Sequence, residues 1–272
     1  MDIDIKYELE KCANDFYYFC ENYVKIIDIN RNLVDFKLYD YQKRYINEIE
    51  NNRFLINKKF RMGGFTTTNL VWSLWNCMFK YDQNIIFLSK QDRDCINNSD
   101  LLRDVIINLP DWLKPHMNKL SDYSFVFNKS ENKIHFNVPE MCCGKHSNYV
   151  FIEEAAFIKN MDQHWKAIFP LIASKRGRCI ISSSIDDSSV NSTNWFKKTY
   201  QDAEQNKIWF SIFHCSYLEN PIFATYEWQS KMKNILGEKY WKSAVLCEFE
   251  DKDLNCVLYK DKVIYNGMIY DF

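Results

Sequence analysis

One stretch, residues 57–68, constrains the fold of this chain more than any other. It reads N-K-K-F-R-M-G-G-F-T-T-T and follows the short apolar run at residues 54–56. An apolar segment of helical length, residues 70–79, comes directly after it. A strand, a glycine turn and hydroxyl side chains at the start of a helix form the layout of a phosphate-binding loop, where backbone N–H groups and the helix dipole hold an anion. The stretch therefore predicts a strand–loop–helix unit that binds phosphate.

The loop departs from the standard phosphate-loop pattern, G-x-x-x-x-G-K-[ST], at one position. Phe65 stands where a lysine should precede Thr66. A threonine hydroxyl at the Thr66 position can hold Mg²⁺ beside the phosphates. The missing lysine means that the loop does not define the function by itself, and other segments must support the assignment.

Composition sets limits on the class of protein. The chain has 272 residues, of which 47% are hydrophobic, so one large or two small domains with a large core are expected. The net charge of −1 provides no global basic field, so any contact with DNA must be local or made by an assembly. Ten cysteines without a C-x-x-C pair or a secretory signal indicate reduced thiols in a cytosolic setting. No apolar run approaches the length needed to cross a membrane.

A second motif, residues 149–157, reads Y-V-F-I-E-E-A-A-F. Apolar residues that end in two acids are typical of a Walker B strand, which is buried on both faces and opens toward the nucleotide. Glu153 would face Mg²⁺, and Glu154 would polarise the attacking water as a general base. The alternative is a solvated acidic pair at a strand end with no catalytic role.

Other segments predict strands that alternate with helices. Residues 85–89 and 179–181 read as buried parallel strands, and the second is followed by Ser182, Ser183 and Ser184. These hydroxyls would bond the γ-phosphate or the attacking water, unless they only begin a loop. The alternation predicts βαβ units and a mostly parallel sheet. Further expected elements are helices at 5–27, 91–109, 226–236 and 239–246, an antiparallel pair at 124–127 and 133–136, and a strand at 207–214.

Gln42 lies ahead of the loop in the segment L-Y-D-Y-Q-K-R-Y-I. A glutamine amide offers one donor and one acceptor, which match the N6 and N7 groups of adenine. The alternative is an exposed helix residue. Its place before a phosphate loop favours the adenine contact.

These four signals, in this order, resemble the ATPase domain of the large terminase subunit, the DNA-packaging motor of tailed bacteriophages and related viruses. The segments L-P-D-W-L-K-P and E-E-A-A-F-I-K-N-M-D-Q-H-W are also similar to family motifs, and the resemblance covers residues 35–255. It implies an α/β fold: a P-loop NTPase of the ASCE type, with a mostly parallel central sheet flanked by helices and a small C-terminal subdomain. The implied division is a helical lead-in at 1–34, the ATPase core at 35–205, and the subdomain with the start of a linker at 206–272.

The resemblance also implies a role for each matching residue. The family has a variant loop, K-x-R-x-x-G-x-[ST], in which Lys59 would replace the missing lysine and Arg61 would act on the γ-phosphate. Glu154 matches the catalytic glutamate, and Thr66 and Glu153 match the metal-binding positions. The implied nucleotide-binding set is Gln42, Lys59, Arg61, Met62, Gly63, Gly64, Phe65, Thr66 and Thr67, and the implied coupling motif is Ser182, Ser183 and Ser184.

The chain also departs from the family pattern. Met62 stands where glutamine is frequent, Glu153 replaces an aspartate, and Ile185 follows serines where threonines and proline are common. Large subunits carry an RNase H-like nuclease domain after the ATPase. Since this sequence ends at Phe272, nuclease activity is not expected of it.

The expected function is therefore an ATP-hydrolysing, Mg²⁺-dependent motor that drives double-stranded DNA into a procapsid. The implied partners are DNA, the portal protein, the small terminase subunit and further copies in a ring, in the host cytoplasm and without a membrane. Two alternatives stay open: a helicase-like ATPase, or a degenerate nucleotide-binding or assembly module that does not hydrolyse ATP. Phe65 and Glu153 are the residues that favour the degenerate module.

Overall fold

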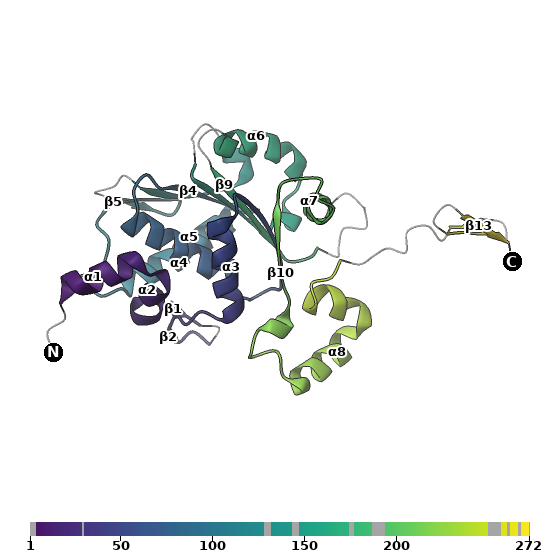
Figure 1. Ribbon diagram of the computed structural model, residues 1–272, viewed down its shortest axis with the longest axis horizontal. Helices are drawn as coiled ribbons and strands as arrows, with labels where there is room; N and C mark the ends of the chain where they lie inside the picture. Colours follow the sequence, from purple (N-terminus) through teal and green to yellow (C-terminus); the bar gives the residue numbers. More distant parts are fainter. Residues whose placement is uncertain are drawn as a thin grey trace.

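The computed structural model describes residues 4–28, 30–127, 132–142, 147–173, 177–186, 194–249, 257–259, 262–265 and 268–271. Within these ranges the helices are α1 (Ile5–Asn14), α2 (Phe16–Tyr23), α3 (Asp40–Asn51), α4 (Phe65–Phe79), α5 (Asp92–Ile107), α6 (Met161–Ala173), α7 (Trp195–Glu204) and α8 (Tyr226–Tyr240). The strands are β1 (Lys25–Ile27), β2 (Leu33–Asp35), β3 (Phe54–Lys59), β4 (Asn84–Leu88), β5 (Met117–Ser121), β6 (Ser124–Phe127), β7 (Lys133–Asn137), β8 (Tyr149–Glu153), β9 (Arg178–Ser183), β10 (Ser211–Cys215), β11 (Val257–Tyr259), β12 (Lys262–Tyr265) and β13 (Met268–Asp271). Figure 1 shows how they are arranged.

The main sheet, counted over the described residues, has eight strands in the order β10-β3-β9-β8-β4-β7-β6-β5. Neighbouring strands from β10 to β7 are parallel, while β6 and β5 are added antiparallel at one edge. The expected mostly parallel sheet is confirmed, and so is the antiparallel pair of β6 with β7. The order is a doubly wound arrangement, in which ligands bind beyond the carboxyl ends of the strands.

Helices cover both faces of the sheet, which explains the continuous apolar runs of the central strands. Successive side chains of β8 point to opposite faces: Phe151 packs into one buried cluster, and Val150 and Ile152 pack into the other. The first cluster includes residues of α2 to α5, and the second includes residues of α6 and α7. Figure 1 shows these two helical layers on either side of the strands.

The N-terminal segment differs from the single helix expected over residues 5–27. Asp15 adopts an extended conformation between α1 and α2, and its carboxylate caps α2 by accepting from the backbone N–H groups of Tyr17 and Tyr18. The strand β1 then pairs antiparallel with β2. The lead-in is therefore two helices and a small ribbon, because a capping aspartate ends one helix and starts the next.

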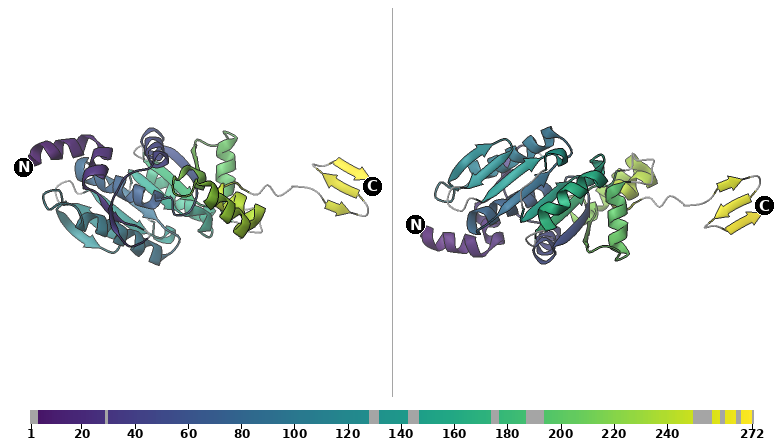
Figure 2. Two further views of the ribbon diagram at one scale, coloured as in Figure 1. Left: turned by 90° about the horizontal axis from the view of Figure 1, so that it is seen from below. Right: turned by 90° about the horizontal axis from the view of Figure 1, so that it is seen from above.

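The C-terminal segment begins inside the main sheet. β10 pairs in parallel with β3, although the sequence analysis placed its residues in the C-terminal subdomain. The helix α8 follows β10 and is kinked at Gly237 (φ 71°, ψ 166°), between the two helices expected at 226–236 and 239–246. A π-helical turn, Trp241–Val245, follows α8. β11 to β13 form a separate antiparallel sheet near the C-terminus (Figure 2). None of the helices in the described ranges is long and apolar enough to cross a membrane.

Candidate nucleotide-binding and catalytic site

The predicted strand–loop–helix unit is formed by β3, the loop at residues 60–64 and α4. Gly64 precedes α4 in the left-handed conformation, at φ 71°. A Cβ atom at this position would lie 2.6 Å from Nε2 of Gln42. Only glycine meets both demands without strain, since it has no Cβ and adopts positive φ freely. Thr66, on the first turn of α4, lines a cavity, so the N-terminus of this helix is a candidate anion site.

Gln42 contacts the loop through its amide. Its Nε2 donates to the Gly63 carbonyl at 3.1 Å, and its Oε1 accepts from the Tyr39 backbone N–H at 2.9 Å. The side chain is 3% exposed, so the alternative of an exposed helix residue is wrong. Both amide groups already bind backbone, so an adenine contact would require them to exchange partners. The adenine role stays a prediction.

Phe65, at the position of the missing lysine, points into the core. Its ring lies 5.5 Å from Tyr41, 5.1 Å from Tyr45 and 6.3 Å from Phe213, measured between centroids. Only its backbone is therefore available to a ligand. Met62, in contrast, has a side chain that is 69% exposed, and Thr67 is half-buried on the first turn of α4.

Lys59, the last residue of β3, forms an ion pair with Glu154. Its neighbour Lys58 points to the opposite face of the sheet, where its Nζ lies 4.4 Å from the centroid of the Tyr200 ring. Strand alternation therefore sends only Lys59 to the acidic pair. The Lys59 side chain is 6% exposed, and a buried ammonium of this kind is stable only when it is paired.

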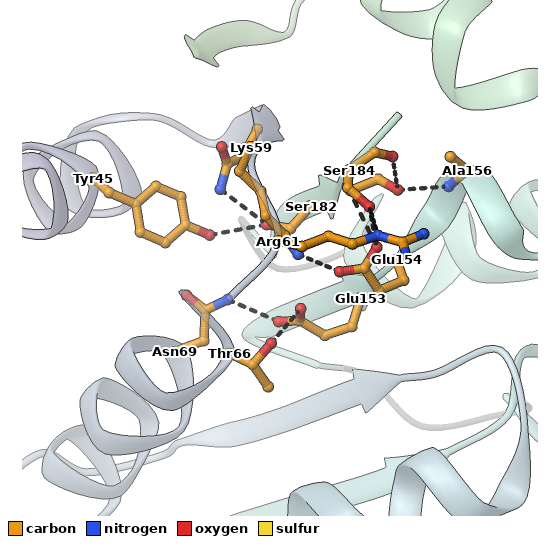
Figure 3. A network of polar contacts seen from close by, with 12 residues as sticks. Tyr45, Lys59, Arg61, Thr66, Asn69, Glu153, Glu154, Ala156, Ser182 and Ser184 are labelled. Carbon is orange, nitrogen blue, oxygen red and sulfur yellow. Dashed lines mark hydrogen bonds and ion pairs between the residues drawn. The ribbon is translucent and has the colours of Figure 1, made fainter. Parts of the chain in front are cut away.

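Glu153 is held by two residues of α4 (Figure 3). Thr66 Oγ1 donates to its Oε2 at 3.1 Å, and Asn69 Nδ2 donates to its Oε1 at 2.8 Å. Burial raises the pKa of Glu153 above its ordinary value, while the charge of Lys59 and the Asn69 hydrogen bond oppose that rise. The predicted metal-binding pair, Thr66 and Glu153, is thus brought into direct contact.

Glu154 lies at the centre of a second set of contacts. Burial favours a higher pKa for its carboxyl, but the Lys59 ion pair and hydrogen bonds from Ser184 outweigh it and lower the pKa. Ser184 Oγ donates to Glu154 Oε2 at 3.1 Å and accepts from Arg61 Nε at 3.1 Å. The Arg61 guanidinium also lies 5.1 Å from the centroid of the Phe157 ring. The structure therefore joins Lys59, Glu154, Ser184 and Arg61 in one continuous chain of polar contacts, visible in Figure 3.

The other two serines of β9 face different neighbours. Ser183 Oγ accepts from the Ala156 backbone N–H at 3.0 Å, which fixes the turn after Glu154. Ser182 Oγ lies 3.1 Å from the Tyr45 hydroxyl and accepts from Asn57 at 3.3 Å. Of the three, only Ser184 contacts the acidic pair. All three are buried, at or directly after the end of β9. The alternative that they only begin a loop stays open for Ser182 and Ser183, while the coupling role stays a prediction.

Sequence reasoning missed four residues of this site: Asn57, Asn69, Tyr45 and Phe157. Asn69 follows Thr66 by three positions on α4, a spacing that places two side chains on one helix face and that the sequence displays. Tyr45 and Phe157 come from α3 and from the turn after β8, and no local pattern links either of them to the loop. Their roles follow only from the packing of α3 and that turn against the strands.

The donor atoms here fit a magnesium ion. A cavity of about 230 Å³ is lined by Thr66, Glu153 and Glu154 together with residues at the start of α5. Hydroxyl and carboxylate oxygens are the ligands that Mg²⁺ prefers, and it is usually held by one or two carboxylates plus substrate phosphates. The described residues contain no group of three or more His, Cys, Asp or Glu that could hold a metal ion.

Comparison with solved structures finds this fold in large terminases of bacteriophages. No protein-family model matches the sequence. The large terminase ATPase domain of Thermus phage P74-26 superposes with a TM-score of 0.60 at 14% identity, over 79% of this chain and 95% of that one. The HK97 bacteriophage large terminase gives a TM-score of 0.63 at 13% identity, over 89% of this chain and 50% of that one.

A third match has bound nucleotide. The large terminase of a thermophilic bacteriophage, in complex with ADP, gives a TM-score of 0.58 at 11% identity, over 86% of this chain and 66% of that one. The same protein in complex with ATP-γ-S also matches. The chain described here therefore has the fold of the large terminase ATPase domains.

Proposed function

We propose that this chain is the ATP-hydrolysing motor domain of a terminase large subunit, and that it drives double-stranded DNA into a procapsid. The observation that supports this most strongly is the set of contacts from Lys59 through Glu154 and Ser184 to Arg61. It places a candidate base, two cations and a hydroxyl at the carboxyl edge of the sheet, beside the N-terminus of α4. The similarity to terminase ATPase domains, among them nucleotide complexes, supports the same reaction.

Each residue of the site has a proposed role in nucleotide binding or hydrolysis that follows from its position. The N-terminus of α4 binds the phosphates, and Lys59 turns from Glu154 to the phosphate charge once a nucleotide enters. Glu154, freed from that ion pair, accepts a proton from the attacking water. Arg61 stabilises charge that develops on the γ-phosphate, and Ser184 links its position to that of Glu154. Thr66 and Glu153 would hold Mg²⁺, which supplies positive charge next to the phosphates.

The partners follow from the proposed function. They are double-stranded DNA, the portal protein, the small terminase subunit and further copies of this chain in a ring, all in the host cytoplasm. A net charge of −1 is compatible with this role because each copy in a ring needs few DNA contacts. The buried pairing of Lys59 with Glu154 favours hydrolysis over a degenerate nucleotide-binding module, since a solvated, idle acidic pair would need no such partner.

Replacing Glu154 with glutamine tests the reaction. We expect Glu154→Gln to lower phosphate release from ATP by at least 10²-fold, because the amide cannot take a proton from water, whereas nucleotide binding persists. Phosphate release and binding of a fluorescent ATP analogue are measured with Mg²⁺ and excess DNA. Glu10→Gln, at an exposed position on α1, is the matched control and should hydrolyse like the wild type. Equal phosphate release from wild type and Glu154→Gln would reject the motor and leave the degenerate module.

A further inference from the structure

Asn69 is the buried partner of Glu153, and no motif in the sequence pointed to it. Its side chain is fully buried, and its Nδ2 donates to Glu153 Oε1 at 2.8 Å. Thr66, one turn earlier on α4, donates to the other carboxylate oxygen at 3.1 Å. The two residues therefore hold the two carboxylate oxygens from the same helix, as Figure 3 shows.

The two contacts differ in their access to the ligand cavity. Thr66 and Glu153 line the cavity of about 230 Å³, whereas Asn69 is not among its lining residues. Asn69 therefore supports the carboxylate without lining the cavity. Oε2 of Glu153 is bound by a residue that lines the cavity, and Oε1 is bound by one that does not.

A glutamate has one more rotatable bond than the aspartate that occupies this position in the family pattern. An unrestrained glutamate would sample more orientations, and ordering it for a metal would cost additional side-chain entropy. The Asn69 hydrogen bond removes that freedom before any ligand binds. Such supporting contacts commonly change metal affinity 10- to 100-fold when they are removed.

We propose that Asn69 is a positioning residue that holds the Glu153 carboxylate ready for the divalent cation of a bound nucleotide. This inference rests on the proposed function, because the cation arrives with ATP. It also accounts for how a glutamate can replace the shorter acid at this strand end. The helix that supplies the metal-binding hydroxyl supplies the support for the carboxylate as well.

The test is the Mg²⁺ dependence of nucleotide affinity in Asn69→Leu, a change that keeps the branched shape and the number of side-chain heavy atoms and removes the donor. A fluorescent ATP analogue is titrated in EDTA and then at increasing Mg²⁺. We expect unchanged affinity in EDTA and a Mg²⁺ midpoint raised by about 10-fold or more. Asn76→Leu is the matched control, because Asn76 is a buried asparagine of the same helix whose amide donates to the Trp72 carbonyl instead. Its Mg²⁺ midpoint should equal that of the wild type.

A double-mutant cycle with Glu153→Asp separates positioning from general damage to the fold. The shorter acid withdraws from Asn69, so Asn69→Leu should add little to the Mg²⁺ midpoint of Glu153→Asp. If Asn69→Leu does not fold, Asn69→Ala, which only removes atoms, takes its place in the cycle. Independent effects that multiply in the double variant would overturn the proposal, and so would a midpoint shift no larger than that of Asn76→Leu.

The outcomes for the two proposals are distinct. Phosphate release by the wild type is measured in the same preparations. A wild type that binds nucleotide in a Mg²⁺-dependent way without hydrolysing it contradicts the proposed function and leaves the Asn69 comparison readable. A wild type whose nucleotide affinity ignores Mg²⁺ overturns the positioning role directly.

Discussion

At the scale of single residues, two adjacent lysines of β3 differ in whether they face the acids. Lys58 and Lys59 are both buried, yet strand alternation directs them to opposite faces of β3. Lys59 pairs with Glu154, whereas Lys58 lies 4.4 Å from the Tyr200 ring centroid and has its pKa lowered by burial. Lys58 and Lys59 are therefore the same residue type in two different environments, and variants at the two positions can be compared directly.

We expect Lys59→Met to abolish ATP hydrolysis and to lower the free energy of unfolding by about 2 kcal/mol. The loss is smaller than for a fully buried ion pair because the Glu154 side chain is 35% exposed and solvent partly compensates it. Phosphate release and urea unfolding measure the two effects. Lys58→Met serves as the control and should retain hydrolysis, since that side chain lies on the opposite face of the sheet from Glu154. If the two variants turn over ATP equally, Lys59 is not part of the site.

At the scale of elements, the join between β3 and α4 depends on one glycine conformation. Gly64 and Gly237 have the same φ of 71°, but a Cβ at Gly64 would meet Gln42 whereas one at Gly237 meets nothing within 4 Å. Their ψ angles differ, at 11° for Gly64 and 166° for Gly237, so Gly64→Ala incurs the cost of a left-handed residue, about 1–2 kcal/mol, whereas alanine at Gly237 would enter a region essentially restricted to glycine. Gly64→Ala also pushes against the Gln42 amide.

We predict that Gly64→Ala destabilises the wild-type protein by about 1–2 kcal/mol more than it destabilises the Gln42→Ala variant. The excess arises because Gln42 must give up its hydrogen bonds to Gly63 and Tyr39, each worth about 1 kcal/mol. Urea unfolding of the two single variants, the double variant and the wild type measures the difference. In the Gln42→Ala background the clash is gone and only the cost of the left-handed residue remains. An equal loss in both backgrounds would show that the loop tolerates the added atom.

At the scale of the whole molecule, the net charge limits how one copy could make the proposed contact with DNA. The net charge is −1, so no overall field attracts a polyanion. A motor that shares its DNA contacts among copies needs only a few phosphate contacts in each. Local charge and assembly would then replace the basic surface that a solitary DNA-binding protein requires.

The salt dependence of DNA binding measures those contacts. For a single copy we expect affinity for double-stranded DNA to fall by no more than about 50-fold between 50 and 200 mM salt, as for about three phosphates. Fluorescence anisotropy of a labelled duplex gives the slope at protein concentrations where the chain is monomeric. A loss of about 10³-fold or more would indicate six or more contacts per copy, and would contradict the shared mode of binding.

Local patterns predicted the elements that make the sheet. The apolar runs at 85–89 and 149–152 form most of β4 and β8. Gly64 lies directly before α4, and Glu153 is the last residue of β8, as their spacing indicated. The patterns did not separate α1 from α2, because the capping role of Asp15 depends on its backbone conformation. They also did not show that β10 joins the main sheet, since pairing between distant strands leaves no local signal.

By itself, the sequence determined the strand–loop–helix unit, the acidic strand end and the order of the segments, because these depend on side-chain periodicity and on glycine. Only the tertiary structure decided which side chains meet. Lys59 reaches Glu154 across 95 positions of sequence, and Asn69 reaches Glu153 across 84. Parallel pairing of β3, β9 and β8 brings their carboxyl ends to one edge, and that register is a property of the packed sheet. Contacts between distant segments depend on packing, which no single segment encodes.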